Sequence, residues 1–160
     1  HVLFSRTVKE NILFGHPQGT DEDIETAIRL SHFQKDLEML PQGLETLVGE
    51  KGVALSGGQK QRISIARALI KNPEILLLDD SLSAVDAKTE ARIIENIQLE
   101  RKDKTTIIST HRLSAIQHAD RIIVLDDGVM IEEGTHEDLL ANEGWYKEQF
   151  DRQQIEEVPS

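Results

Sequence analysis

Leu55-Ser56-Gly57-Gly58-Gln59 opens the most informative segment of this chain, and Lys60-Gln61-Arg62 follows it directly. Ser56 can cap a helix, because its side-chain oxygen can accept a hydrogen bond from an amide of the first turn. The two glycines behind it let the backbone approach a ligand with no Cβ in the way. Free amides and the helix dipole then converge on an anion. The segment therefore predicts a phosphate-binding turn at the start of a helix.

A short apolar run, Ile75-Leu76-Leu77-Leu78, lies downstream and ends in Asp79 and Asp80. The run is too short for a helix of its own and is typical of a buried parallel strand. In α/β proteins, ligands bind at the C-terminal edge of such strands. We therefore expect two carboxylates at the ligand-binding edge of a parallel sheet.

Taken alone, each pattern has a plainer interpretation, because a Ser-Gly pair usually forms a turn and an acid after an apolar run usually marks a strand that ends at water. Taken in this order, the two patterns resemble the ATP-binding cassette (ABC) family, whose signature sequence reads LSGGQ and whose Walker B strand ends in an Asp. The resemblance covers nearly the whole chain. It implies an α/β fold of the P-loop NTPase type that binds ATP and Mg2+. We call residues 55–59 the signature loop.

Composition narrows the classes of partner. The chain has 160 residues, of which 38% are hydrophobic, enough for one domain with a core or for part of a larger domain. Its formal net charge of -11 argues against a nucleic acid or an anionic membrane surface as the main partner. The absence of cysteine fits a reducing cytosol and equally fits a secreted protein without disulfides. No apolar run approaches the roughly 20 residues that span a bilayer, so another segment would have to carry any membrane span.

The sequence contains no phosphate loop of the form G-x-x-x-x-G-K-[ST]. The two Lys-Thr pairs, Lys88-Thr89 and Lys104-Thr105, follow Ala87 and Asp103 and so lack the required glycine. Residues 1–5 resemble the segment just after the glutamine of the family's Q-loop. We therefore expect a fragment of a cassette, with the Walker A loop, the Q-loop glutamine and the base-stacking aromatic upstream of residue 1.

Helices are predicted before the signature loop, over residues 7–14, 20–30 and 33–40. Thr7 with Glu10, and Thr20 with Asp23, have the spacing of capping boxes, which start helices. Apolar residues recur on one side of these segments, as in helices that cover a core. Residues 1–55 match the helical subdomain that leads into the signature loop in the family.

Helices and strands alternate after the signature loop, which predicts an α/β arrangement. Helices are expected over 59–71, 86–101, 113–117 and 145–154 and after Thr135, and strands over 75–79, 105–109, 121–126 and 129–132. We expect the first two strands to be buried, Asp127-Gly128 to turn a hairpin, and Ala91, Ile94 and Ile97 to face inward. Residues 56–160 would then form the C-terminal part of the ATPase core of a single cassette, a mainly parallel sheet with flanking helices and a C-terminal β-hairpin.

The resemblance assigns roles to the two acids after the apolar run. Asp79 corresponds to the Walker B residue that holds Mg2+; the plainer alternative is a strand-end carboxylate that caps the next turn. Asp80 stands where hydrolytic cassettes usually have a catalytic Glu. Its carboxylate would be withdrawn by roughly 1 Å, and a misplacement of that size can lower a rate on the order of 100-fold. A slow site is therefore expected, unless a backbone shift restores the position.

Two further residues match family motifs. His111 follows Ser109-Thr110 and corresponds to the H-loop histidine that hydrogen-bonds the γ-phosphate, although a lone histidine is often only a surface or core residue. Ser83-Ala84-Val85-Asp86 resembles the D-loop, which lies across the dimer interface. From the residues alone, Asp86 is an N-cap after a turn, and both roles can hold at once.

The segment Thr46–Gly52 resembles the loop that precedes the signature in exporters, although Leu47 stands where an acid is usual. In the family its Glu50 would face the coupling helices of a transmembrane domain. A solvated charge in a glycine-rich loop is the alternative.

In this family two cassettes face head to tail, so the signature loop of one closes over ATP held by the other. The resemblance thus implies an ABC exporter ATPase that pairs with a second cassette, as a homodimer or heterodimer, at the cytoplasmic face of the cell membrane. An intact signature beside Asp80 favours the degenerate half of a heterodimer. An importer cassette, a soluble ABC protein of the translation or DNA-repair kind, and a pure interaction module remain as alternatives.

Overall fold

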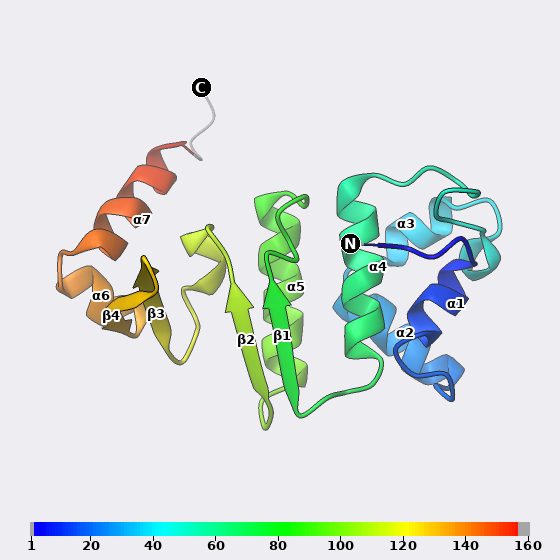
Figure 1. Cartoon of the computed structure of the whole chain (residues 1–160), viewed down its shortest axis with the longest axis horizontal. Coiled ribbons are helices and arrows are strands. Elements are labelled where there is room, and N and C mark those ends of the chain that lie inside the picture. The colour runs from blue at the N-terminus through cyan, green and yellow to red at the C-terminus, as the bar shows by residue number, and fades with distance from the viewer. Residues whose placement is uncertain (1, 157–160) are drawn as a thin grey trace. The chain divides into compact units, whose positions relative to one another are not determined.

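Residues 2–156 are described by the structure, a computed structural model, in which the chain divides between Thr110 and His111 into two compact units. The elements of the first unit are α1 (Val8–Leu13), α2 (Asp21–Leu30), α3 (Gln34–Met39), η1 (Gly43–Glu45), α4 (Gly57–Leu69), β1 (Ile75–Asp79), α5 (Ala87–Glu100) and β2 (Thr105–Ser109) (Figure 1). Those of the second unit are η2 (Leu113–Ile116), β3 (Ile122–Asp126), β4 (Val129–Gly134), α6 (His136–Ala141) and α7 (Trp145–Glu156). The predicted elements are confirmed, with ends that shift by a few residues.

Side-chain caps fix where the helices begin. Capping boxes form at Thr7 before α1, Thr20 before α2, Ser56 before α4 and Thr135 before α6. In each box a hydroxyl accepts from an amide of the first turn, and the side chain three residues on accepts from the amide of the cap residue. The caps of these four helices are therefore supplied by residues next to each helix start.

The helices of the first unit share one apolar core. α1 and α2 both pack on α4, and the buried members of the core come from all three helices and from nearby loops: Val8, Ile12, Ile24, Ala27, Ile28, Phe33, Val48, Ile63, Ala66 and Ile70. These side chains recur at helical spacing, as the sequence predicts. Because α4 belongs to this core, the expected boundary between residues 55 and 56 falls inside the first unit, and that division stays a prediction.

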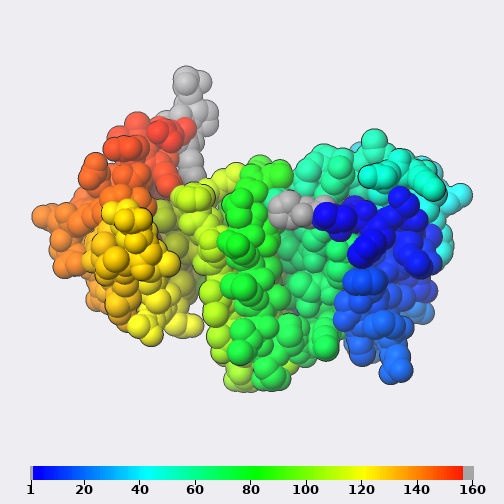
Figure 2. All heavy atoms as spheres, in the orientation of Figure 1, coloured from blue at the N-terminus to red at the C-terminus, as the bar shows by residue number. Residues whose placement is uncertain are grey.

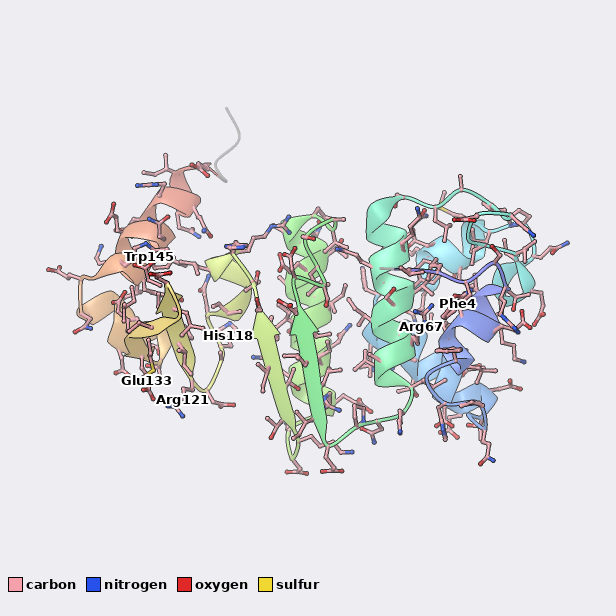
Figure 3. The ribbon with its side chains drawn as sticks, viewed as in Figure 1. Phe4, Arg67, His118, Arg121, Glu133 and Trp145 are labelled. Atoms are coloured by element: carbon pink, nitrogen blue, oxygen red, sulfur yellow. The ribbon has the colours of Figure 1, made fainter. Side chains whose placement is uncertain are left out.

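Arg67 ties α4 to the start of the chain. Its guanidinium donates to the backbone oxygens of Asn11 and Val2, at 2.9 and 3.0 Å, and lies 5.2 Å from the centre of the Phe4 ring. Figure 3 shows Arg67 and Phe4 pointing toward each other from these two segments. The helix that begins at the signature loop is therefore anchored at its other end as well.

β1 and β2 form a parallel pair with Ile75 opposite Thr105 and Asp79 opposite Ser109. The pairing confirms the predicted parallel sheet, but the expectation that both strands are fully buried is wrong. Leu76 and Leu78 are buried, whereas Ile75 and Leu77 are 66% and 63% exposed. Figure 2 shows these strands, in green to yellow-green, open toward the viewer. Only one face of the pair is covered by the described residues.

The inward face of α5 also differs from the expectation. Ile94 and Ile97 are buried, as predicted, but Ala91 is exposed and Ile93 takes its place in the core. The buried positions, which include Glu90, are spaced by three, four and seven residues and so follow the helical period. The predicted residues 91, 94 and 97 are spaced by three, which is less than the 3.6 residues of a helical turn. Ala91 therefore lies outside the buried face, and the prediction fails at that residue.

The second unit is built on an antiparallel hairpin. β3 pairs with β4, and Asp127 and Gly128 turn the chain with φ values of 47° and 75°. Positive φ at both central residues is the conformation that an Asp-Gly hairpin turn supplies, so this prediction is confirmed. Arg121 and Glu133 form an ion pair across the strands (Figure 3).

Among residues 2–156, no helix has the length and apolar character needed to cross a bilayer.

Candidate functional site

The signature loop adopts the predicted helix-capping geometry at the start of α4. The Ser56 hydroxyl accepts from the Gln59 amide at 3.2 Å, and the Ser56 amide donates to Oε1 of Gln59 at 2.8 Å. The amides of Gly57 and Gly58, as the first two of the helix, have no intrahelical acceptor. Two backbone donors and the positive end of the helix dipole therefore lie next to the Ser56 hydroxyl.

The two glycines differ in their surroundings. Ser56 and Gly57 are exposed, whereas Gly58 is buried. A Cβ on Gly58 would lie 2.9 Å from the backbone oxygen of Ala84, and one on Gly57 would lie 3.2 Å from the Ala84 Cβ. The sequence suggests that both glycines clear the way for a ligand. The structure adds a second reason, since Gly58 lets α4 pack against the loop after β1. Leu55 is half-buried against the helical core.

Gln61, to which no sequence motif assigns a role, links α4 to the loop that resembles the D-loop. Its side chain is 1% exposed; Nε2 donates to Ser83 Oγ at 2.9 Å, and Oε1 accepts from the Ala84 amide at 2.8 Å. A polar residue four positions before buried Ile65 is a signal for such a contact, because both lie on one face of the helix.

Asp79 and Asp80 both lie exposed at the C-terminal end of β1. The Asp80 amide donates to the Ser109 carbonyl at 3.1 Å, so the backbone here continues the pairing with β2. Asp80 has a φ of 47°, in the left-handed region that Asp tolerates better than most residues. The expected pair of carboxylates at the edge of a parallel sheet is thus present, in a strained turn that the sequence does not reveal.

Asp86 acts as the N-cap of α5. Its Oδ1 accepts from the Thr89 amide at 2.9 Å and its Oδ2 from the Thr89 hydroxyl at 2.6 Å. The hydroxyl bond, together with the amide bond, lowers the pKa of Asp86 from its ordinary value. The cap predicted from the sequence is therefore formed, and a role for Asp86 at a dimer interface stays a prediction.

His111 begins the second unit and is exposed. Its carbonyl accepts from Nε2 of Gln153 at 2.7 Å, while Oε1 of Gln153 accepts from the Leu113 amide at 2.9 Å. Gln153, on α7, thus fixes the backbone around His111, a contact that no local sequence pattern predicts.

Across residues 2–156 no group of three or more metal-binding side chains lies at one point. A Mg2+ ion commonly takes only one or two carboxylates, with the remaining ligands from phosphates and water, so Asp79 alone fits that mode.

The alternation of helices with a parallel strand pair, together with the capped start of α4 and the carboxylates after β1, defines an α/β protein with a candidate phosphate-binding turn. Residues 1–83 match the family described as ABC transporter. This chain belongs to that family.

Curated relatives extend the match over most of the chain. It is 71% identical, over 97% of its length, to the probable multidrug resistance ABC transporter ATP-binding/permease protein YheI of Bacillus subtilis. It is 53% identical, over 96% of its length, to the multidrug resistance-like ATP-binding protein MdlA of Buchnera aphidicola. The chain spans 26% and 27% of these two relatives, about a quarter of each.

A solved structure gives the same result for the fold. The chain resembles a bacterial Atm1-family ABC exporter, solved with ATP bound, with a TM-score of 0.88 and 43% identity. The similarity covers 95% of this chain and 27% of that one. The cassette fold expected from the sequence is therefore confirmed.

Proposed function

We propose that this chain is part of the nucleotide-binding domain of an ABC exporter, which couples ATP binding and hydrolysis to export of a substrate across a membrane. The named relatives support export, and the start of α4 supports nucleotide contact. The observation that carries the proposal is the exposed Ser56 hydroxyl beside the amides of Gly57 and Gly58, which have no intrahelical acceptor.

In this proposal the signature loop serves a second cassette. Ser56, Gly57 and Gly58 donate to the γ-phosphate of ATP that the partner cassette holds, and Gln59 fixes the loop. Asp86 lies at the interface between the cassettes. ATP then joins the two cassettes, and hydrolysis releases them.

The chain's own nucleotide site would use the carboxylates after β1. Asp79 would hold Mg2+, which when bound neutralises charge on the β- and γ-phosphates. Asp80 would orient the attacking water, and His111 would hydrogen-bond the γ-phosphate. Since Asp80 is shorter than the usual Glu, we propose that this site is slow and that the chain pairs with a more active cassette in a heterodimer.

The remaining partners follow from the same assignment. The exposed Glu50 would face the coupling helices of the transmembrane domain, at the cytoplasmic face of the cell membrane. The isolated chain is expected to hydrolyse no ATP, because the sequence lacks the G-x-x-x-x-G-K-[ST] loop that binds the phosphates.

Ser56→Arg in the full-length protein tests the proposal. A bulky side chain at the loop removes the hydroxyl donor and blocks the two amides. ATP turnover should fall on the order of 100-fold, as when a donor to a developing charge is lost. Gln18→Arg adds the same charge at an exposed position and should change little. Equal turnover in the Ser56 and Gln18 variants would contradict the proposal.

Asp80→Glu in the full-length pair tests the slow site. The longer carboxylate should raise ATP turnover, although Glu tolerates the left-handed conformation at this position less well than Asp. Unchanged turnover, in a variant whose nucleotide binding is intact, would remove the reason for assigning a slow site to this chain.

A further inference from the structure

Asp36, on α3, lies at the centre of a polar cluster that holds the signature loop. Its Oδ1 accepts from Nε2 of Gln59 at 3.0 Å and from Nη2 of Arg62 at 3.1 Å, and its Oδ2 accepts from Nη1 of Arg62 at 2.7 Å. The Asp36 and Arg62 side chains are only 17% and 14% exposed. The ion pair is therefore bidentate and largely screened from water, which makes it stronger than a surface pair.

The cluster fixes the orientation of the Gln59 amide group. A carboxylate can only accept hydrogen bonds, and a backbone N–H group can only donate one. Nε2 of Gln59 must therefore face Asp36, and Oε1 must face the Ser56 amide, 2.8 Å away. Without Asp36, the side-chain amide group of Gln59 could rotate and lose its hydrogen bond to the Ser56 N–H group.

Arg62 extends the same clamp to the backbone. It donates from Nε to the Gly58 carbonyl at 3.3 Å and from Nη1 to the His32 carbonyl at 3.1 Å, and its guanidinium lies 5.8 Å from the centre of the Phe33 ring. A guanidinium presents its donors in a planar fork, so it can serve the carboxylate and these carbonyls together. The first turn of α4 is thereby held against the start of α3.

We propose that Asp36 and Arg62 are positioning residues for the signature loop. They hold Ser56, Gly57 and Gly58 in the arrangement that meets the terminal phosphate on the neighbouring cassette. The inference rests on the proposed function for the identity of that ligand, whereas the clamp lies entirely within this chain. Replacing Asp36 or Arg62 should therefore weaken the binding of a nucleotide that neither residue touches.

The test is a double-mutant cycle in the full-length protein with Asp36→Asn and Ser56→Ala. The readout is the ratio of affinities for a non-hydrolysable ATP analogue and for ADP, because only the analogue carries the terminal phosphate. Each variant should lower the ratio, on the order of 10-fold or more, since a displaced donor loses most of its contribution. The double variant should lower the ratio by less than the product of the two single effects, because residues that act through a shared contact are not additive.

Matched variants separate positioning from general loss of structure. Glu38→Gln removes the same charge from an exposed position of α3 and should leave the ratio unchanged. Misfolded protein lowers the number of binding sites but not the affinity ratio of the sites that remain. If Asp36→Asn does not fold, Arg62→Lys keeps the charge without the fork and should still lower the ratio.

The possible results overturn different statements. An unchanged ratio in the Asp36 or Arg62 variants, with a lowered ratio in Ser56→Ala, would overturn the positioning role and leave the proposed function intact. Additive effects of Asp36→Asn and Ser56→Ala would also overturn it. An unchanged ratio in Ser56→Ala would overturn the proposed function and this inference with it.

Discussion

The start of α4 and the end of β1 carry the two sets of residues proposed to act on nucleotide, yet the chain supports them very differently. At the start of α4, buried or half-buried side chains from α3 and α4 hold the loop through direct hydrogen bonds. At the end of β1, both carboxylates are exposed; the backbone there pairs with β2, and the Ser81 and Ser83 hydroxyls donate to the Asp79 and Asp80 carbonyls. The start of α4 is thus fixed by side chains from another helix, whereas the end of β1 is fixed by its neighbouring strand and by the loop that follows it.

Replacing Asp79 should give the largest effect and should separate the two regions. Asp79→Asn removes the charge without changing shape, so Mg2+-dependent ATP binding at the chain's own site should weaken by about 100-fold, since loss of a group that merely supports a ligand already costs 10–100-fold. Stability should not change, because the side chain is exposed. A Mg2+ titration of nucleotide binding by the full-length protein measures the effect.

Asp103→Asn is the control for that experiment, because it removes the same charge from another exposed position. If both variants bind the magnesium–nucleotide complex equally well, Asp79 is only the end of a strand.

Gln61→Leu should give a smaller effect, this time on stability. Leucine is close in size and keeps the buried position filled, but it leaves the Ala84 amide without the acceptor that it has now, in a part-buried bond. Losing such a hydrogen bond costs about 0.5–1.5 kcal/mol, so the free energy of unfolding of the chain should fall by that amount in a denaturant titration. Gln34→Leu, at an exposed position, should cost much less. Equal costs would mean that α4 and the loop after β1 are not coupled through Gln61.

The contrast between the regions also explains what the sequence could predict. Caps such as Ser56 with Gln59 and Thr20 with Asp23 act over three residues, so their pattern is visible in the sequence. The contacts of Asp36 with Gln59 and of Gln61 with Ser83 join residues 23 and 22 positions apart. No local period records such pairs, and so the support of the loop appears only once α3, α4 and the loop after β1 are packed together.

The prediction that both faces of β1 and β2 are buried fails for a related reason. The run from Ile75 to Leu78 predicts burial on both sides, because parallel strands usually have covers on both faces. In residues 2–156 one side is open, and Ile75 and Leu77 are exposed there. The sequence of a strand shows that both of its faces are apolar enough to be buried. Whether each face is buried depends on the segments that pack against it.

Substitution of alanine for Gly57 and for Gly58 compares two positions to which the sequence pattern assigns the same role. Gly58→Ala should lower the free energy of unfolding by about 1–3 kcal/mol through crowding against the Ala84 carbonyl, the usual cost of overpacking. Gly57→Ala should cost less, because a Cβ there meets only a side-chain methyl and alanine favours the helix by roughly 0.5–1 kcal/mol. Denaturant titrations of both variants decide this, and a larger loss for Gly57 would contradict the packing.

The smallest expected effect is the acid sensitivity of the cap on α5. Hydrogen bonds from Thr89 hold the pKa of Asp86 below its ordinary value of 3.8. A carboxyl whose pKa is lowered by folding stabilises the fold above its ordinary pKa, and this contribution is lost as the pH falls through the folded value. Helicity should therefore decline in acid, and Asp86→Asn, which caps equally well but does not titrate, should reduce that decline. Circular dichroism of both forms, followed from about pH 5 to pH 2, gives the comparison. Identical acid profiles would mean that the cap contributes nothing that depends on the charge of Asp86.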